Sequence, residues 1–174
     1  MSEHLGSMAA HTLLATALAA CALCAGWGMV TVVNPETILA TQQDLAAMEW
    51  IRQFTPANAV FLINTRHWQL GMYTGTDGGY WIPLLTGRKT LLPALPYSYG
   101  NPEYVTHISK LAQRVSETLD TSEVGFLDLL EQEGVTHIYI GARGGTLRPE
   151  MLLKDTHCRP VYESGEVWVF EVVR

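Results

Sequence analysis

The strongest constraint on the fold of this 174-residue chain is an uncharged apolar run near its amino end. The 22 residues from Thr12 to Val33 read TLLATALAACALCAGWGMVTVV and contain no Asp, Glu, Lys or Arg. About 20 apolar residues are enough for a helix to cross the hydrocarbon core of a bilayer. Trp27 lies near the end of the run, where interfacial aromatics are common, and Asn34-Pro35 ends it. The run predicts a transmembrane helix over residues 12–33, after a short tail of residues 1–11.

Other interpretations of this run fit less well. A secretory signal carries a basic start, but residues 1–11 contain no Lys or Arg. Leu18-Ala19-Ala20-Cys21 resembles a lipobox, yet the apolar run continues for twelve residues beyond Cys21. A core helix of a soluble protein is rarely apolar all round over such a length. We therefore expect a retained anchor of a single-pass protein in the cell membrane, with membrane lipid as its first partner.

The remaining residues, 34–174, predict one α/β domain. Helical periodicity and helix-start residues predict helices at 41–55, 101–115, 122–133 and 149–154. Apolar and β-branched runs predict strands at 59–63, 135–140, 160–163 and 166–172. Strands that alternate with helices need crossover connections, and Ser164-Gly165 is typical of a hairpin turn. We expect a small three-layer-like domain with a mixed, partly parallel sheet and a C-terminal β-hairpin.

Charge and cysteine content exclude several classes of function. The chain has 11 Lys and Arg against 17 Asp and Glu, which gives a formal net charge of −6. This balance is poorly suited to nucleic-acid binding, which depends on basic groups. Cys21 and Cys24 lie inside the apolar run, and Cys158 has no cysteine partner in the polar part. Because no histidine, cysteine or serine spacing matches a metal or nucleophile motif, we expect no metal, no cofactor and no catalytic residue.

The most informative part of the domain is the segment 64–93, which is long for a connection and reads NTRHWQLGMYTGTDGGYWIPLLTGRKTLLP. Aromatic rings beside one carboxylate and basic groups suit a sugar, since rings stack on its CH faces and polar groups bind hydroxyls or phosphate. The candidate ligand-binding residues are Trp68, Asp77, Trp81 and Arg88. The same pattern also fits a structural role, in which the aromatics anchor the loop and Asp77 caps a turn among glycines.

A second glycine-rich segment, Gly141-Ala142-Arg143-Gly144-Gly145, follows a predicted strand and precedes a predicted helix. Its backbone amides suit an anion nest. It matches neither the Walker pattern nor GxGxxG, so a plain surface loop is the favoured interpretation.

Three stretches give the chain a resemblance to a known family: a hydrophobic span followed by AAMEWIRQFTPANAVFLINT, then GYWIPLLTGRKTLLP, then LLEQEGVTHIYIGARGG with VYESGEVWVFEV. In this order, over about residues 12–174, the chain resembles the C-terminal extracytoplasmic domain of bacterial GT-C-type membrane glycosyltransferase-like proteins, polytopic enzymes that use lipid-phosphate sugars. The resemblance implies an extracytoplasmic domain whose ligand is a glycan or a lipid-phosphate. In that family the catalytic carboxylate lies in an early loop between the first transmembrane helices, and no residue of this sequence matches it.

We therefore expect an accessory or interaction module of a membrane assembly, non-catalytic by itself and partnered by other transmembrane subunits. Two alternatives stay open. One is a structural subunit that packs its apolar helix on neighbouring spans through the small residues Ala19, Ala20, Ala25, Gly26 and Gly28. The other is a membrane-anchored enzyme whose site lies in the segment 64–93.

Overall fold

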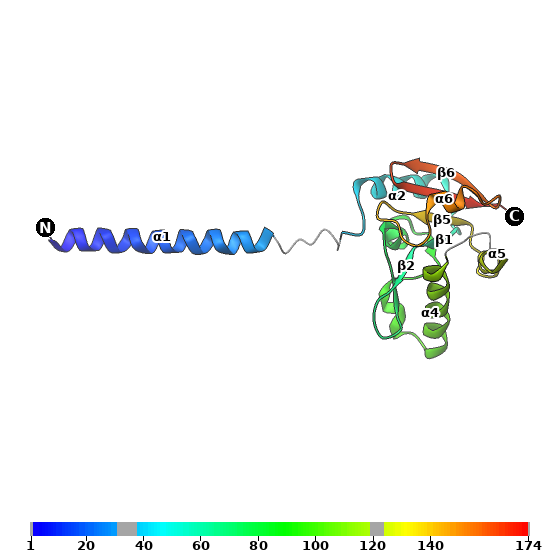
Figure 1. Cartoon of the computed structure of the whole chain (residues 1–174), viewed down its shortest axis with the longest axis horizontal. Coiled ribbons are helices and arrows are strands. Elements are labelled where there is room, and N and C mark those ends of the chain that lie inside the picture. Colours follow the sequence, from blue (N-terminus) through cyan, green and yellow to red (C-terminus); the bar gives the residue numbers. More distant parts are fainter. Residues whose placement is uncertain (1, 31–37, 119–123, 174) are drawn as a thin grey trace. The chain divides into compact units, whose positions relative to one another are not determined.

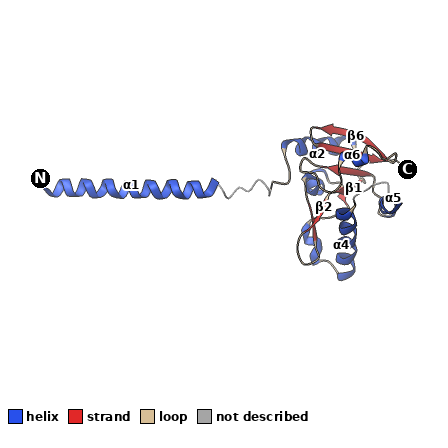
Figure 2. Cartoon of the chain, viewed as in Figure 1, coloured by secondary structure: helices blue, strands red, loops and turns tan. Residues whose placement is uncertain are grey.

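A computed structural model describes residues 2–30, 38–118 and 124–173 of the chain (Figures 1 and 2). The chain separates into two units, Met1–Ile38 and Leu39–Arg174. The described part of the first unit is one long helix, α1 (Ser2–Val30), and the second unit is an α/β domain.

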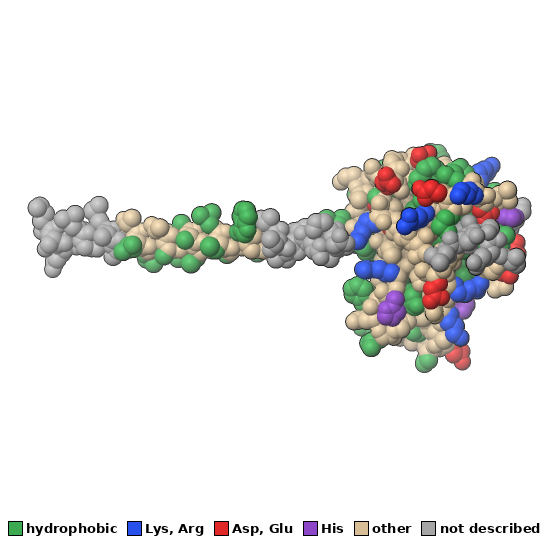
Figure 3. Space-filling view, viewed as in Figure 1, with side chains coloured by type: hydrophobic (Ala, Val, Ile, Leu, Met, Phe, Trp, Pro, Cys, Tyr) green, Lys and Arg blue, Asp and Glu red, His purple; other side chains and the backbone are tan. Residues whose placement is uncertain are grey.

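Helix α1 contains a stretch, His11–Met29, that is long and apolar enough to cross a membrane. None of this stretch is buried inside the protein itself. Figure 3 shows hydrophobic side chains along the coloured part of α1, while acidic and basic side chains are scattered over the visible face of the α/β domain. A helix that exposes apolar side chains all round is typical of a membrane span. The predicted span continues to Val33, and its residues 31–33 lie outside the described residues.

Short helices and strands alternate along the α/β domain. The helical elements are α2 (Gln42–Phe54), η2 (Gly78–Trp81), α3 (Ile82–Thr86), η3 (Leu95–Tyr99), α4 (Pro102–Glu117), α5 (Val124–Gln132) and α6 (Pro149–Leu152). The strands are β1 (Val60–Ile63), β2 (Thr65–His67), β3 (Tyr73–Gly75), β4 (Lys89–Thr90), β5 (His137–Ile140), β6 (Cys158–Ser164) and β7 (Val167–Val172). Five strands form one sheet in the order β4-β1-β5-β7-β6, and β2 pairs with β3 separately.

The main sheet is mixed. Strand β1 runs parallel to β4 and β5, whereas β7 runs antiparallel to β5 and β6. This confirms the predicted α/β class with a mixed, partly parallel sheet. Parallel neighbours require crossovers, which pass through the segments between β1 and β4 and between β4 and β5. The outermost strand β6 has a register shift between Pro160 and Tyr162.

Two hydrophobic clusters form the core. The first joins α2 and Ile82 of α3 to Phe61 and Tyr139 of the sheet. The second joins α5 and α6 to Leu62 and Ile138. Because successive residues of a strand point to opposite faces, the two clusters lie on the two faces of the sheet. Helices α2 and α3 therefore cover one face, and α5 and α6 cover the other.

The local structure departs from the sequence prediction at two places. The segment 64–93 is not an irregular loop, because it contains β2, β3, η2, α3 and β4. The connection of the C-terminal hairpin is Gly165-Glu166 rather than Ser164-Gly165. Gly165 has φ of +59°, a left-handed conformation that glycine adopts without a Cβ penalty, and this places the turn one residue later.

Candidate functional site

The parallel strands β1 and β5 end side by side, and Asn64 and Gly141 are the residues that follow them. Asn64 is fully buried, although it is polar. In open α/β sheets, ligands bind in the crevice outside the carboxyl ends of such strands. Functional groups are therefore expected at this edge of the sheet, which we call the carboxyl edge.

The first buried acid at the carboxyl edge is Asp44, from the first turn of α2. One of its oxygens, Oδ2, accepts hydrogen bonds from the backbone N–H and the hydroxyl of Thr41, at 2.6 and 2.7 Å. The other, Oδ1, accepts from the hydroxyl of Tyr139 at 2.7 Å and from the backbone N–H of Ala142 at 3.1 Å. Asp44 thus completes the capping box of α2, whose N-cap is Thr41, and it also ties that helix to β5 and to the loop that follows it.

The second buried acid is Asp77, which caps η2. Its Oδ1 accepts from the backbone N–H of Gly79 at 2.9 Å, and its Oδ2 accepts from the backbone N–H of Gly141 at 2.8 Å. Burial raises the pKa of Asp77 to about 7, and the neighbouring Asp44 carboxylate adds to this rise, while the two amide hydrogen bonds oppose it. Asp77 is therefore an acid whose protonation changes near neutral pH.

Gly141 lies between the two acids. A Cβ at this position would lie 2.7 Å from Oδ1 of Asp44 and 2.8 Å from the Cβ of Asp77. No side chain fits into such a space without a shift of the backbone, so glycine is required for the close approach. The two acids and this glycine are therefore in close contact at the start of the loop 141–147.

Three hydrogen bonds with Asn64 and Thr76 hold the loop 141–147 in place. The amide of Asn64 donates to the carbonyl of Leu147 at 3.0 Å, and the backbone N–H of Leu147 donates back to Asn64 at 2.8 Å. The hydroxyl of Thr76 donates to the carbonyl of Gly144 at 2.8 Å. Paired buried polar groups of this kind favour one conformation of the loop. The backbone of the loop 141–147 is therefore held in one conformation before any ligand binds.

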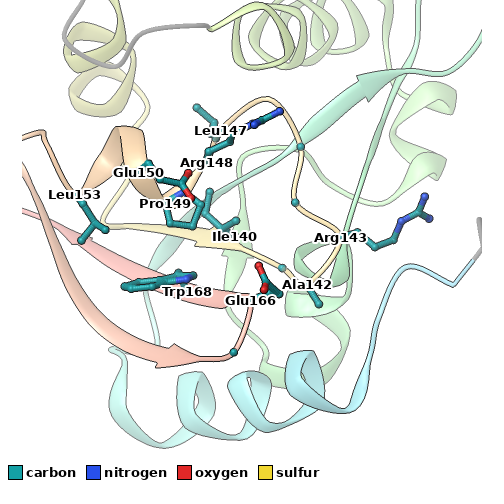
Figure 4. Close-up of a pocket in the computed structure, with 14 residues that line it drawn as sticks. Ile140, Ala142, Arg143, Leu147, Arg148, Pro149, Glu150, Leu153, Glu166 and Trp168 are labelled. Carbon is teal, nitrogen blue, oxygen red and sulfur yellow. The ribbon is translucent and has the colours of Figure 1, made fainter.

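A cavity of about 490 Å³ lies on one side of the loop 141–147 (Figure 4). Its wall includes the loop itself, the start of α6 and the β6–β7 turn. In Figure 4, Trp168, Glu150 and Glu166 lie among the lining side chains, whereas Arg143 extends away from them. An indole ring offers an apolar face, and two carboxylates accept hydrogen bonds from hydroxyl groups. Arg143 and Arg148 also line this space, so its two carboxylates are matched by two guanidinium groups. We call it the acidic cavity, after Glu150 and Glu166.

A second cavity of about 600 Å³ adjoins the first, because Gly145 and Arg148 line both. The residues that line it are Thr65, Arg66, Thr76, Gly145, Thr146, Arg148 and Met151. Two of these are arginines, and among the described residues that line it there is no carboxylate. Guanidinium groups donate paired hydrogen bonds that match the oxygens of a phosphate or a carboxylate. We call this space the basic cavity.

Two of the predicted ligand-binding residues bind other parts of their own chain. Asp77 is fully buried and bonded to backbone amides, as the structural alternative from the sequence proposed. Arg88 donates to the backbone carbonyls of Arg52 at 2.9 Å and Thr55 at 2.8 Å, at the end of α2. These are helix-capping and turn-capping interactions that hold η2 and α2 in place.

The two predicted tryptophans lie apart from these polar contacts. The guanidinium carbon of Arg66, which lines the basic cavity, is 5.4 Å from the ring centre of Trp68. Trp81 lies at the junction of η2 and α3 and is partly exposed. Among the described residues, none of Trp68, Asp77, Trp81 and Arg88 lines the acidic or the basic cavity. Ligand binding by this set stays a prediction.

The residues that line the two cavities came only partly from the sequence pattern. The sequence offers the loop Gly141–Gly145 as a candidate anion nest, with a plain surface loop as the favoured interpretation, and it places the basic residue Arg66 in the segment 64–93. Arg148, Glu150 and Trp168 carry no motif, and only the fold brings them together. The position of Arg148 directly before Pro149, the first residue of α6, was the one local signal for it.

Comparisons with known protein families and with curated proteins find no match for this chain. The class of the protein therefore follows from its own structure: an apolar helix suited to a membrane, joined to an α/β domain with an acidic and a basic cavity at its carboxyl edge.

Proposed function

We propose that this chain is a single-pass membrane protein whose extracytoplasmic α/β domain binds a phosphate-bearing glycan at the carboxyl edge. In this proposal the domain is a non-catalytic accessory module of a membrane assembly, like the C-terminal domain of the GT-C-type proteins that the sequence resembles. The exposed apolar surface of α1 supports the membrane anchor, because that surface is unfavourable in water.

One observation carries the choice of ligand: the acidic and the basic cavity adjoin and share Arg148. A sugar ring in the acidic cavity would place its hydroxyls near Glu150 and Glu166 and its CH face near Trp168. A phosphate joined to that sugar would enter the basic cavity, between Arg66 and Arg148. Among the described residues, neither of these arginines forms an ion pair with a carboxylate.

The experiment is calorimetric titration of the full chain in lipid nanodiscs with three probes: glucose 1-phosphate, glucose and inorganic phosphate. We expect glucose 1-phosphate to bind more tightly than either fragment, because it occupies both cavities. Arg148→Gln should weaken binding of both phosphate probes by about 10- to 100-fold, the loss of one charged hydrogen-bonding group. Trp168→Ala should weaken binding of glucose 1-phosphate and leave inorganic phosphate unchanged.

The matched control is Arg159→Gln, since Arg159 is exposed, pairs with Glu171 on the hairpin and lines neither cavity. It should bind all probes like the parent chain. The proposal is wrong if the folded parent chain binds none of the probes, or if Arg148→Gln binds phosphate as tightly as Arg159→Gln does. Release of inorganic phosphate from bound glucose 1-phosphate, followed by phosphorus NMR, would instead favour the membrane-anchored enzyme.

One observation favours a role as structural subunit as well. None of His11–Met29 is buried inside the protein, and the small residues of α1, among them Gly26, allow another span to approach closely. Extraction in a mild detergent should then recover the chain together with a second membrane protein, and Gly26→Leu should release that partner. A chain that remains monomeric at every concentration would contradict this role.

A further inference from the structure

The segment around α3 exposes a run of large apolar side chains. The exposed fractions are 42% for Trp81, 73% for Leu84 and 41% for Leu85, and Pro83 between them is also exposed. We call these four residues the α3 patch. Consecutive exposed apolar residues are unfavourable in water, and they mark a contact surface when they occur in a folded element.

The exposure of the α3 patch is fixed by the fold. Ile82 is fully buried in the first core cluster, and Thr86 is nearly so. The hydroxyl of Thr86 donates to the carbonyl of Ile82 at 2.7 Å, and Gly87 ends the helix in a left-handed conformation. Because both ends of α3 are held, the patch cannot turn inward to cover itself. It must therefore meet either water or a partner.

The charged residues that follow the α3 patch in the sequence are basic, and the exposed acid of the neighbouring helix α2, Glu49, is paired with Arg52. Residues 78–102 contain no Asp or Glu, whereas Arg88 and Lys89 follow the patch directly. Lys89 is exposed, and the Arg88 guanidinium is held at the end of α2. Basic side chains beside Trp and Leu are typical of segments that lie in the interfacial region of an anionic bilayer.

The chain itself limits the distance between this domain and a membrane. Helix α1 ends at Val30 and α2 begins at Gln42, so eleven residues, 31–41, connect the two. At about 3.5 Å per residue, they span at most about 40 Å. Helix α3 packs against α2, the first helix after this connection. The connection therefore tethers the α/β domain to a bilayer that holds α1.

We propose that the α3 patch inserts into the interfacial region of the bilayer that holds α1. Trp81 lies at the level of the headgroups, Leu84 and Leu85 enter the upper acyl region, and Lys89 contacts lipid phosphates. This docking rests on one part of the proposed function, the membrane anchor, and needs neither the glycan ligand nor any other subunit. It fixes which face of the α/β domain lies on the lipid.

The test measures the depth of spin labels on the full chain in vesicles of phosphatidylcholine and phosphatidylglycerol at a ratio of about three to one, a composition that provides anionic lipid. Cys21→Ala and Cys24→Ala remove the exposed thiols, and the buried Cys158 remains. A nitroxide at Leu84→Cys should collide more often with oxygen, which concentrates in lipid, than with a water-soluble nickel chelate.

The control site is Leu153→Cys, an exposed apolar position directly after α6, on the opposite face of the sheet. We expect the oxygen-to-nickel collision ratio at 84 to exceed that at 153 by about threefold or more, as for a residue below the headgroups. A water-like ratio at 84, equal to that at 153, refutes the docking. Protection of position 84 from both reagents also refutes it, because it indicates contact with protein.

A third label separates this proposal from the anchor on which it rests. A nitroxide at Ala19→Cys, in the middle of α1, reports whether that helix spans the bilayer. If the label at position 19 is in lipid and the label at position 84 is in water, the docking of the α3 patch is wrong, while α1 still spans the bilayer. If 19 is in water, the anchor is wrong, and with it the basis of the docking.

Discussion

The stability of the α/β domain should fall as the pH rises through Asp77. Burial raises the pKa of Asp77 from 3.8 to about 7 in the folded chain, and the unfolded chain keeps the ordinary value. Between these values the native state holds a proton that the unfolded state has lost, so proton binding favours the native state. That stabilisation is complete below the unfolded pKa and disappears as the pH rises to about 7. Each pH unit is worth about 1.4 kcal/mol while Asp77 stays protonated in the folded chain, and this slope flattens as the pH approaches 7. A change from pH 5 to pH 7 should therefore lower the free energy of unfolding by about 2 kcal/mol.

The assay is urea unfolding of the full chain in detergent micelles at pH 5, 6 and 7, followed by near-ultraviolet circular dichroism. Other groups titrate too, so the measured quantity is the pH slope relative to Asp77→Asn, which keeps the shape of the side chain and loses the titration. The exposed acid Glu163 provides the control, and Glu163→Gln should keep the slope of the parent chain. An equal slope in Asp77→Asn, or a parent chain that gains stability from pH 5 to pH 7, would refute the reasoning.

Three further predictions concern single residues. Gly141→Ala should destabilise the domain by at least about 2 kcal/mol, because its Cβ would lie 2.7 Å from a buried carboxylate oxygen. Gly125→Ala, whose Cβ would have its nearest neighbour at 4.0 Å, should be neutral or slightly stabilising in the same urea titration. Arg88→Gln should cost about 1–3 kcal/mol, since it removes charged hydrogen bonds to the carbonyls at the end of α2; unchanged unfolding would show that those carbonyls find other donors. Burial raises the pKa of Cys158 to about 12, so in a chain without the other two cysteines iodoacetamide at pH 8 should label it only after unfolding, as checked by mass spectrometry.

Local sequence signals are sufficient for the helices α2, α4, α5 and α6 and for the strands β1 and β5. Thr41 caps α2 and Asn101 caps α4 in the structure, because a short polar side chain before an apolar periodic segment satisfies the free amides of a helix start. Strand β1 is a continuous apolar run, and β5 is apolar after His137, as expected for strands covered on both faces.

The segment 64–93 was misjudged because its strands are only two or three residues long. Such strands show no alternation over enough residues to stand out from a loop, and their pairing depends on contacts elsewhere in the chain. The glycines near Asp77 were recognised as turn formers. Asp77 accepts a hydrogen bond from the amide of Gly141, which is 64 residues away in the sequence. This contact depends on the pairing of β1 with β5, and no local sequence pattern predicts that pairing.

The carboxyl edge could be predicted in outline and not in detail. A glycine-rich loop after a strand signals that edge, and Gly141–Gly145 has this form. The two cavities, however, combine Arg66 from β2, Arg148 from the start of α6 and Trp168 from β7. Each of these residues is unremarkable within its own segment, so the site exists only through the topology of the sheet.

The register shift in β6 has a consequence for molecules that share a membrane. Anchored copies diffuse in one plane with a common orientation, which favours sideways encounters between the free borders of their sheets. Border strands that are long and regular join to one another through unpaired amides and carbonyls. In this protein one border is the two-residue strand β4, and the other is interrupted where Pro160, which has no amide hydrogen, precedes the shift. Neither border offers a regular template, so copies held in one bilayer by α1 would be poorly suited to pair through their sheet borders.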